Sequence, residues 1–310
     1  MTGRSILRTL SLSALPMDSD RRMFARIAQQ LMRAPRDLPA RINRQNVGNY
    51  LTYRRYAFDC PVCGNRTTPL YDFPDLPLRR EHKVGELRET LQCRRCFASM
   101  RARSLAISFL DEIYRRTSMR HASIAALAAA GLGDVRVLDT DNFSAMSRLL
   151  GDDVSYVRCS YLPDRPWGSA LSPNYFNIDL ERIDFDDASF DVVLTSDVME
   201  HVRDSDAAHS EIHRILRPGG TYIFTAPYSD AEEKNITLVD TSSDVDIFLH
   251  PAQYHGDPLT GGVLAYRIFG RELIGDLEEL GFSVTVECVD RPSSLVINAN
   301  VFVARQEARA

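Results

Sequence analysis

The sequence predicts an α/β protein in which a doubly wound, mainly parallel sheet of seven strands follows a small cysteine-rich module. Short apolar runs alternate with amphipathic segments over residues 131–304, and the last two runs have no helix between them. Such alternation is typical of a parallel sheet with helices on both faces. Four cysteines within residues 51–105 indicate the separate module.

The composition allows a sizeable hydrophobic core. The chain has 310 residues, of which 44% are hydrophobic, enough for one large domain or two smaller ones. No apolar run approaches the roughly 18 residues of a membrane span, and the N-terminal residues lack a signal-peptide core. We therefore expect a cytoplasmic protein.

Charge is divided unevenly along the chain. Residues 1–130 hold 23 Lys and Arg against 11 Asp and Glu, whereas residues 131–310 hold 14 against 31. The basic part could meet nucleic acid, a phosphorylated substrate or an acidic protein surface, or it could pack against the acidic part of its own chain. Nucleic acid is the less favoured partner because no aromatic-rich RNA-binding motif is present.

The N-terminal region divides into three predicted segments. Residues 1–50 form an arginine-rich helical segment, residues 51–105 the cysteine module, and residues 106–130 linking helices. The spacing of apolar residues predicts helices over residues 23–32, 102–115 and 121–130.

The four cysteines of the module form two CxxC pairs separated by 29 residues, Cys60 with Cys63 and Cys93 with Cys96. Two intervening residues let both thiolates of a pair reach one tetrahedral ion, with the backbone amides between them turned inward. The spacing predicts a structural Zn²⁺ site, since four sulfur ligands leave no open position for catalysis; unpaired reduced cysteines are the alternative.

Residues 131–310 form the second predicted domain, which holds the sheet. Strands are expected at residues 135–139, 154–159, 175–178, 190–195, 222–225, 283–289 and 295–304, and helices at residues 204–216 and 271–280. Cys159 and Cys288 fall in these apolar runs and are expected in the core. An insertion at residues 228–265 is expected to form a lid over the carboxyl edge of the sheet, where open α/β sheets bind ligands.

The most informative run is FDVVLTSDVMEHV, from residue 190, followed by RILRPGGTYIFTAP, which ends at residue 227. It contains a buried strand that ends in polar residues, a Glu-His pair, a helix and a Pro-Gly-Gly turn before another strand. This order resembles the second half of a class I S-adenosylmethionine-dependent methyltransferase, of the type 11-like group associated with bacterial polysaccharide and glycan genes. The resemblance covers residues 131–304 and implies a Rossmann-like sheet; some sugar methyltransferases also carry an N-terminal zinc lobe.

The resemblance implies that the loop after the first strand binds S-adenosylmethionine. In the family this loop follows an acid and is rich in glycine. Here its residues are Asp139, Thr140, Asp141, Asn142 and Phe143, so that the acid keeps its place but the glycines are missing.

Further cofactor contacts are implied at the ends of three other strands. Ser160 occupies the region of the family's ribose-binding acid. Asp179 and Leu180 match the family's Asp-Leu pair, whose acid meets the adenine amino group. Ser196 and Asp197 are expected to line the pocket floor beside the methionine moiety. Each acid could instead cap the helix that follows it.

Methyl transfer to oxygen or nitrogen requires that the acceptor lose a proton, and histidine suits this task because its ordinary pKa is near neutrality. His255, in the YHGDP run of the insertion, is the expected general base, with Asp257 orienting it or the acceptor. His201, which follows the fourth strand, is the second candidate. A polar turn that only closes the lid is the alternative.

The expected function is O-methylation of a sugar or other small glycan-type acceptor, whose nucleotide or phosphate group the arginine-rich lobe could hold. One alternative is an RNA methyltransferase with a zinc lobe. Another is a non-catalytic methyltransferase fold that serves as a binding subunit. The missing glycines favour the last alternative, whereas the polar groups gathered at one sheet edge oppose it.

Overall fold

A computed structural model of the chain describes residues 44–71, 87–243, 245–255 and 262–307. The arginine-rich segment before residue 44, with its predicted helix, lies outside these residues, and so does Asp257. The described residues belong to two compact units, one within residues 1–57 and 67–97 and the other comprising residues 58–66 and 98–310. In the described part of the chain, every helix is too short or too polar to cross a membrane.

The first unit is small. It contains α3 (Arg44–Tyr53), α4 (Leu87–Thr90) and an antiparallel pair of strands, β3 (Pro69–Tyr71) and β4 (Leu91–Cys93). All three residues of β3 are buried. Strand β4 ends at Cys93, so the paired strands hold the start of the second CxxC segment.

The second unit contains an eight-stranded sheet in the order β17-β18-β10-β9-β5-β6-β8-β7. Its strands are β5 (Val137–Asp139), β6 (Tyr156–Ser160), β7 (Ala170–Ser172), β8 (Tyr175–Asn177), β9 (Phe190–Ser196), β10 (Leu216–Thr225), β17 (Phe282–Arg291) and β18 (Val296–Gln306). Five of them, β8, β6, β5, β9 and β10, run parallel, and β18 is antiparallel to both of its neighbours. Seven strands match the predicted ones. The eighth, β7, is largely exposed and pairs with β8 at the sheet edge, so it left no apolar pattern to predict.

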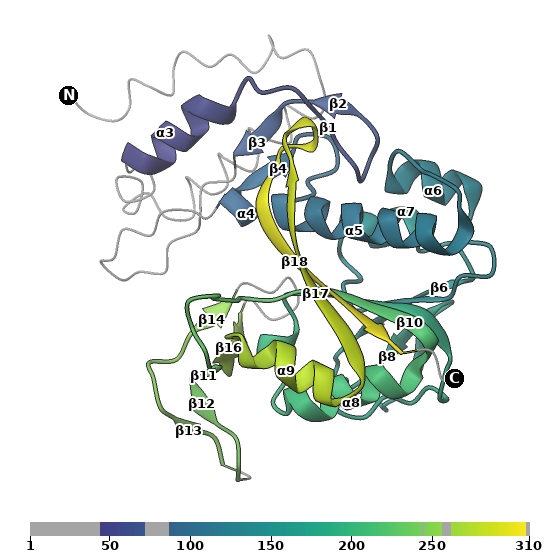
Figure 1. The fold of residues 1–310 in the computed structure, drawn as a ribbon, viewed down its shortest axis with the longest axis vertical. Helices are drawn as coiled ribbons and strands as arrows, with labels where there is room; N and C mark the ends of the chain where they lie inside the picture. Colours follow the sequence, from purple (N-terminus) through teal and green to yellow (C-terminus); the bar gives the residue numbers. More distant parts are fainter. Residues whose placement is uncertain (1–43, 72–86, 244, 256–261, 308–310) are drawn as a thin grey trace. The chain divides into compact units, whose positions relative to one another are not determined.

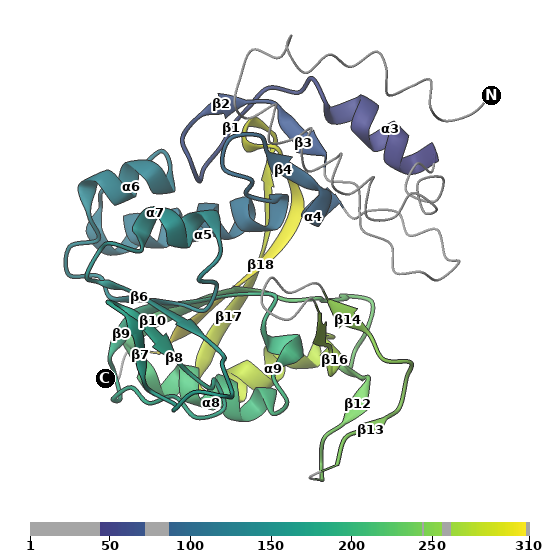
Figure 2. The same cartoon turned by 180° about the vertical axis from the view of Figure 1, so that it is seen from behind.

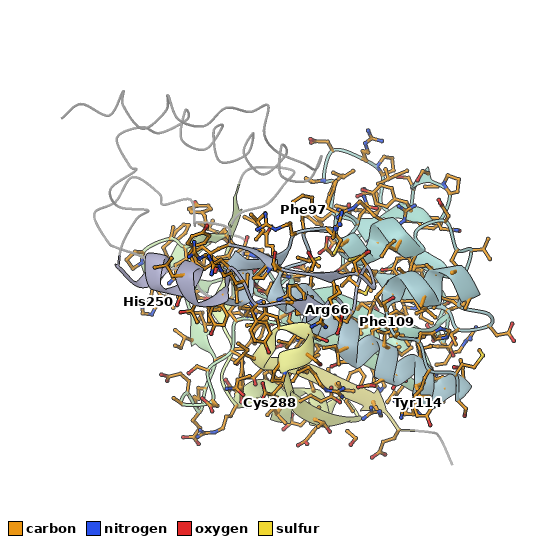
Figure 3. The ribbon with its side chains drawn as sticks, turned by 90° about the horizontal axis from the view of Figure 1, so that it is seen from above. Arg66, Phe97, Phe109, Tyr114, His250 and Cys288 are labelled. Atoms are coloured by element: carbon orange, nitrogen blue, oxygen red, sulfur yellow. The ribbon has the colours of Figure 1, made fainter. Side chains whose placement is uncertain are left out.

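Helices cover both faces of the sheet (Figures 1 and 2). One face carries α5 (Met100–Thr117), α6 (Ile124–Ala130) and α7 (Ala145–Leu150), and the other carries α8 (Ser205–Ile215) and α9 (Glu272–Glu279). Helix α5 begins after Ser99, whose hydroxyl accepts a hydrogen bond from the Ala102 amide. It buries Phe109 against the sheet and exposes Tyr114 (Figure 3).

Stacked aromatic rings form the centre of the core beneath α8 and α9. The Tyr222 and Phe224 rings lie 4.3 Å apart, because alternate residues of β10 point to the same face. Phe224 pairs in register with Phe302 of β18, and their rings stack at 4.7 Å. Burying each of these side chains contributes roughly 1.5–3 kcal/mol, and together they fix the strands that carry the site.

Only one of the two isolated cysteines lies in the core as predicted. Cys159 is buried on β6, but Cys288 is exposed on β17 (Figure 3). The prediction for Cys288 was wrong because β17 is the edge strand of the sheet, and most of its residues are only partly covered.

The insertion consists of short paired strands. These pairs are β11 (Ile236–Thr237) with β16 (Arg267–Ile268), β12 (Val239–Asp240) with β13 (Ile247–Phe248), and β14 (Tyr254–His255) with β15 (Val263–Leu264). Leu238, Val239 and Ala265 form a small core of their own. The pairing of β14 with β15 holds His255 opposite Val263, which fixes one predicted catalytic residue.

Candidate cofactor and acceptor site

The loop between β5 and α7 is held together by the side chain of Asp139, which is 1% exposed. Its carboxylate accepts hydrogen bonds from the Asp141 amide at 2.9 Å, from the Ser147 hydroxyl at 3.0 Å and from the Tyr156 hydroxyl. Burial and, to a smaller extent, the nearby charge of Asp141 raise the pKa of Asp139 to about 7. Asp139 therefore braces the loop from within.

The next four residues present side chains rather than bare backbone. The Thr140 hydroxyl is buried and has no hydrogen-bond partner among the described residues. The Asp141 carboxylate accepts a hydrogen bond from the Phe143 amide at 3.1 Å. Burial raises the pKa of Asp141 above its ordinary value, although the charge of Arg101 opposes this rise. The Asn142 side-chain oxygen accepts a hydrogen bond from Arg158 at 3.3 Å, and the Phe143 side chain is exposed.

Arg101, near the start of α5, joins the loop to the end of β9. Its guanidinium donates to the Ser196 carbonyl at 3.1 Å and to the Ser196 hydroxyl, and it lies 3.4 Å from the Asp197 carboxylate. Asp197 has a φ of 52°, in the left-handed region, and its carboxylate also accepts a hydrogen bond from Thr225 at 2.9 Å. Sequence reasoning missed Arg101, since nothing near it in the sequence distinguishes it from the other arginines.

The ends of β6 and β8 supply a second group of polar and aromatic side chains. Ser160 is buried, with its hydroxyl 2.7 Å from the Tyr175 hydroxyl. One oxygen of Asp179 accepts a hydrogen bond from the Glu181 amide at 3.0 Å. Leu180 belongs to the hydrophobic core, so its side chain faces away from this group.

Tyr161 is a further residue that the sequence did not indicate. It directly follows β6, its ring is exposed, and it lies 5.2 Å from the ring of Trp167. Partial burial and the charges of Asp179 and Glu181 raise the pKa of Tyr161, which places its hydroxyl within electrostatic reach of Asp179. An aromatic face beside a carboxylate is suited to a flat heterocycle that carries an amino group.

These residues fit S-adenosylmethionine, the methyl donor of the family that the sequence resembles. The donor has a carboxylate, an amino group, hydroxyls and an adenine ring. Arg101 offers a cation, and Asp141 and Asp179 offer carboxylates. Thr140 offers a buried hydroxyl that has no hydrogen-bond partner among the described residues. These groups complement the charged and polar parts of the donor.

A separate cluster lies where the strand β9 leads into the short 3₁₀ helix η2 (Met199–His201). Glu200 is fully buried, and one of its oxygens lies 3.7 Å from His201 Nε2 and 3.5 Å from His255 Nδ1. The two imidazole rings meet edge to face at 4.8 Å. The structure thus brings together both histidines predicted for proton transfer, and it adds Glu200, which was not predicted.

Each CxxC pair closes the same backbone turn. The Gly64 amide donates to the Cys60 carbonyl at 2.9 Å, and the Phe97 amide donates to the Cys93 carbonyl at 2.8 Å. Gly64 and Phe97 both have left-handed backbones, with φ of 73° and 64°. In the second pair, the Arg95 amide also approaches the Cys93 sulfur at 3.4 Å, as expected for an amide turned toward a thiolate.

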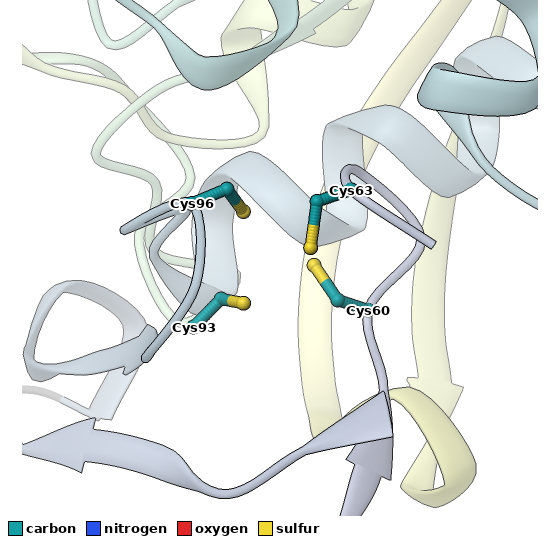
Figure 4. Close-up of side chains that lie close together, drawn as sticks. All are labelled: Cys60, Cys63, Cys93 and Cys96. Atoms are coloured by element: carbon teal, nitrogen blue, oxygen red, sulfur yellow. The ribbon is translucent and has the colours of Figure 1, made fainter. Parts of the chain in front are cut away.

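The sulfur atoms of Cys60, Cys63, Cys93 and Cys96 all lie within 4.8 Å of one another (Figure 4). Zinc–sulfur bonds of about 2.3 Å in a tetrahedron separate the sulfurs by about 3.8 Å. The cluster therefore fits a Zn²⁺ ion, and the spacing of cysteines in the sequence was sufficient to find it.

Comparison with known proteins shows which family part of the sheet domain resembles. Residues 126–224 match the family model described as a methyltransferase domain, and the strand order has the arrangement expected for class I. Over these residues the chain is similar to a methyltransferase domain. The matched residues include β5, α7, β6, β8, β9 and α8.

The methyltransferase domain also has named relatives. Two Xanthomonas proteins, from X. oryzae and X. campestris, are named ubiquinone/menaquinone biosynthesis C-methyltransferase UbiE; each is 32% identical over 94 residues, which are 30% of this chain. The match spans 37% of the length of those relatives. Two solved methyltransferase structures are also similar. The one from Methanosarcina mazei is 15% identical, with a TM-score of 0.33, and the match covers 57% of this chain and 94% of that chain. The one from Mesorhizobium loti is 18% identical, with a TM-score of 0.36, and the match covers 56% of this chain and 92% of that chain.

Proposed function

We propose that this protein is an S-adenosylmethionine-dependent methyltransferase that methylates an oxygen of a sugar or other small glycan-type acceptor. The observation that carries the proposal is that Asp141 and Asp179 follow strands β5 and β8 at their carboxyl ends, the edge of the sheet where Arg101 contacts the end of β9. Ligands bind at this edge of open α/β sheets.

The polar side chains at this edge of the sheet would each bind a different part of the donor. Arg101 would hold the carboxylate of its methionine part, and Thr140 and Asp141 the amino group beside it. Asp179 and Tyr161 would hold the adenine, and Ser160 a ribose hydroxyl. When bound, S-adenosylmethionine supplies an electrophilic methyl group on sulfur; the chain's own work is to orient the acceptor and to accept its proton.

The cluster of Glu200, His201 and His255 supports the second task. His255 is the proposed general base, because its ring belongs to the insertion and keeps 41% of its side chain exposed for an acceptor. Glu200, 3.5 Å away, would stabilise the imidazolium that forms. His201 is more enclosed, with 15% of its side chain exposed, and is the second candidate.

The four cysteines are proposed to hold a structural zinc ion. Four thiolates saturate a tetrahedral ion, so the role would be to hold the two CxxC turns in place rather than to act in catalysis. Metal binding of this kind contributes directly to folding stability.

The first experiment is calorimetric titration of the full chain with S-adenosylmethionine and S-adenosylhomocysteine. Micromolar binding by the wild-type protein, weakened about tenfold or more in Asp179→Asn, is expected. Asp184→Asn serves as the matched control, because Asp184 lies on the same loop between β8 and β9 but has an exposed side chain. Absence of binding to a folded, zinc-loaded protein would indicate a non-catalytic fold, as the missing glycines allow.

The second experiment identifies the acceptor. Transfer of a labelled methyl group is screened with nucleotide sugars, with RNA and, because the Xanthomonas relatives are named for it, with ubiquinone or menaquinone precursors. Turnover on a nucleotide sugar that His255→Ala abolishes, with donor affinity unchanged, is the expected result. Strongly salt-dependent transfer to RNA alone would overturn the glycan assignment.

A further inference from the structure

Glu200 is a buried carboxylate that has no hydrogen-bond partner on either oxygen among the described residues. Its side chain is 0% exposed. Burying an isolated carboxylate is costly, so native proteins pair such groups with a cation or with hydrogen-bond donors. In the described part of the chain, the groups close to the Glu200 carboxylate that can carry a positive charge are the imidazole rings of His201 and His255.

The distances between these groups are too long for hydrogen bonds. Glu200 Oε1 lies 3.7 Å from His201 Nε2 and 3.5 Å from His255 Nδ1, whereas nitrogen–oxygen hydrogen bonds are about 2.7–3.2 Å long. Around a metal ion with bonds of about 2.1 Å, neighbouring ligand atoms lie about 3.0–3.4 Å apart. One ligand atom from each residue falls within 4.8 Å of the others, so the three lie close enough to converge on one ion.

The orientation of His201 is also that of a metal ligand. Its Nδ1 lies 2.8 Å from the Leu264 carbonyl, which can only accept a hydrogen bond, so Nδ1 carries the proton. Nε2, which faces Glu200, therefore has its lone pair available. Metal-binding histidines are commonly fixed in this way through a backbone carbonyl.

The same hairpin positions the third ligand. Strands β14 and β15 pair His255 with Val263 and Tyr254 with Leu264, so the strand that orients His201 also holds His255. The Tyr266 amide donates to the Glu200 carbonyl at 2.8 Å, which ties this segment to η2. The insertion thus completes a site that begins at the end of β9.

We propose that Glu200, His201 and His255 bind one divalent transition-metal ion. Two imidazoles and one carboxylate suit Zn²⁺, Mn²⁺, Fe²⁺ or Co²⁺, and three protein ligands leave positions open for other ligands. Binding of the ion does not depend on the proposed function. Its use does: in a methyltransferase, the ion would lower the pKa of a coordinated acceptor hydroxyl, whose proton would pass to solvent water, and His255 would then act as a ligand instead of as the general base.

Metal stoichiometry of the full chain tests the proposal. After saturation with Co²⁺ or Zn²⁺ and removal of free metal, the wild-type protein should hold two ions, one on the cysteines and one on the cluster. Co²⁺ distinguishes them, because only the cysteine site gives intense thiolate charge-transfer absorption. Glu200→Gln and His255→Ala should each retain the thiolate signal and weaken the second ion more than about 100-fold, beyond the ~10–100-fold effect of disturbing an outer-shell partner.

The matched control is His250→Ala, which removes an exposed histidine of the same insertion (Figure 3) and should leave both ions bound. Circular dichroism establishes that each variant is folded; His255, being partly exposed, is the substitution least able to disturb the core. A single ion in the folded wild-type protein, or a second ion that survives both substitutions, would overturn the proposal. Donor affinity measured on the same samples separates this failure from failure of the proposed function.

Discussion

The Arg101 guanidinium lies 3.4 Å from the Asp197 carboxylate, although the two residues come from α5 and from the end of β9. The Asp197 carboxylate also accepts a hydrogen bond from the Thr225 hydroxyl at the end of β10. The arginine is therefore held at the carboxyl edge of the sheet before any ligand arrives. A cation positioned in advance binds a carboxylate with less loss of side-chain entropy than a mobile one.

Arg101→Ala is accordingly expected to weaken S-adenosylmethionine binding by about tenfold to a hundredfold, the effect of losing a hydrogen bond to a charged group. Calorimetry measures the change. Arg291→Ala, which removes an exposed arginine paired with Asp111, is the control and should bind as the wild type does. If the two variants bind S-adenosylmethionine with equal affinity, Arg101 does not contribute to binding of the donor.

Removal of zinc should destabilise the protein. Dialysis against a strong chelator is expected to lower the melting temperature, and Cys63→Ser should abolish the thiolate absorption of the Co²⁺-loaded protein. Cys288→Ser is the control, because Cys288 is exposed and far along the chain from the CxxC pairs. Identical melting curves with and without chelator would show that the cysteines do not hold a structural ion.

Gly64→Ala should destabilise the protein by about 1–2 kcal/mol. Gly64 has a φ of 73°, and an added Cβ would lie 2.8 Å from the hydroxyl of Ser123, the residue that caps α6. Gly275→Ala, at a helical position of α9 with open space around it, should instead stabilise by about 0.5–1 kcal/mol. Urea unfolding of both variants compares them directly, and similar shifts would refute the argument.

His209 should make stability depend on pH. Burial lowers the pKa of His209 to about 3, with a smaller contribution from the charge of Arg267. Below its ordinary pKa of about 6.5, the unfolded chain therefore binds a proton that the folded chain does not, and stability falls as the pH falls. Relative to His209→Leu, the wild type should lose about 1 kcal/mol of unfolding free energy between pH 6.5 and 5.5. Parallel pH profiles would contradict this.

Arg103→Ala should be strongly destabilising, by about 2–5 kcal/mol. Arg103 is 0% exposed and donates to the carbonyls of Ala98 and Leu295, each at 2.8 Å, and of Ser294 at 3.1 Å. Loss of its side chain would remove the hydrogen-bond donors of three carbonyl groups and would also leave a cavity. Arg66→Ala, at an exposed ion pair (Figure 3), should change stability by less than about 1 kcal/mol. Urea unfolding measures both.

The sheet could be predicted because its central strands are buried on both faces and so are continuous apolar runs. Asp191, in the Phe-Asp pair that begins the run from residue 190, shows that a resemblance in sequence does not reveal what each residue does. It lies at the amino end of β9, where it accepts hydrogen bonds from the Arg136 amide at 2.8 Å and from Arg217 at 2.7 Å. The motif that revealed the family thus includes an acid that joins strands rather than one that binds a ligand.

The site could be predicted only where its chemistry is local in the sequence. The CxxC spacing and the Glu-His pair are visible in a few residues, whereas Arg101 meets Ser196 through packing of α5 on the sheet. Likewise, the sequence places Asp139 in a loop but cannot show that Tyr156, on the neighbouring strand, takes one of its hydrogen bonds. Tertiary contacts of this kind carry no periodic signal.

The loop after β5 keeps its own amides occupied: those of Asp141 and Phe143 donate to the side chains of Asp139 and Asp141. A glycine-rich loop meets its ligand through peptide groups, which are the same in every protein and which single substitutions rarely alter. Here the loop presents a hydroxyl and carboxylates instead. Each of those side chains can be changed by one codon, so the chemistry that this loop presents can evolve residue by residue.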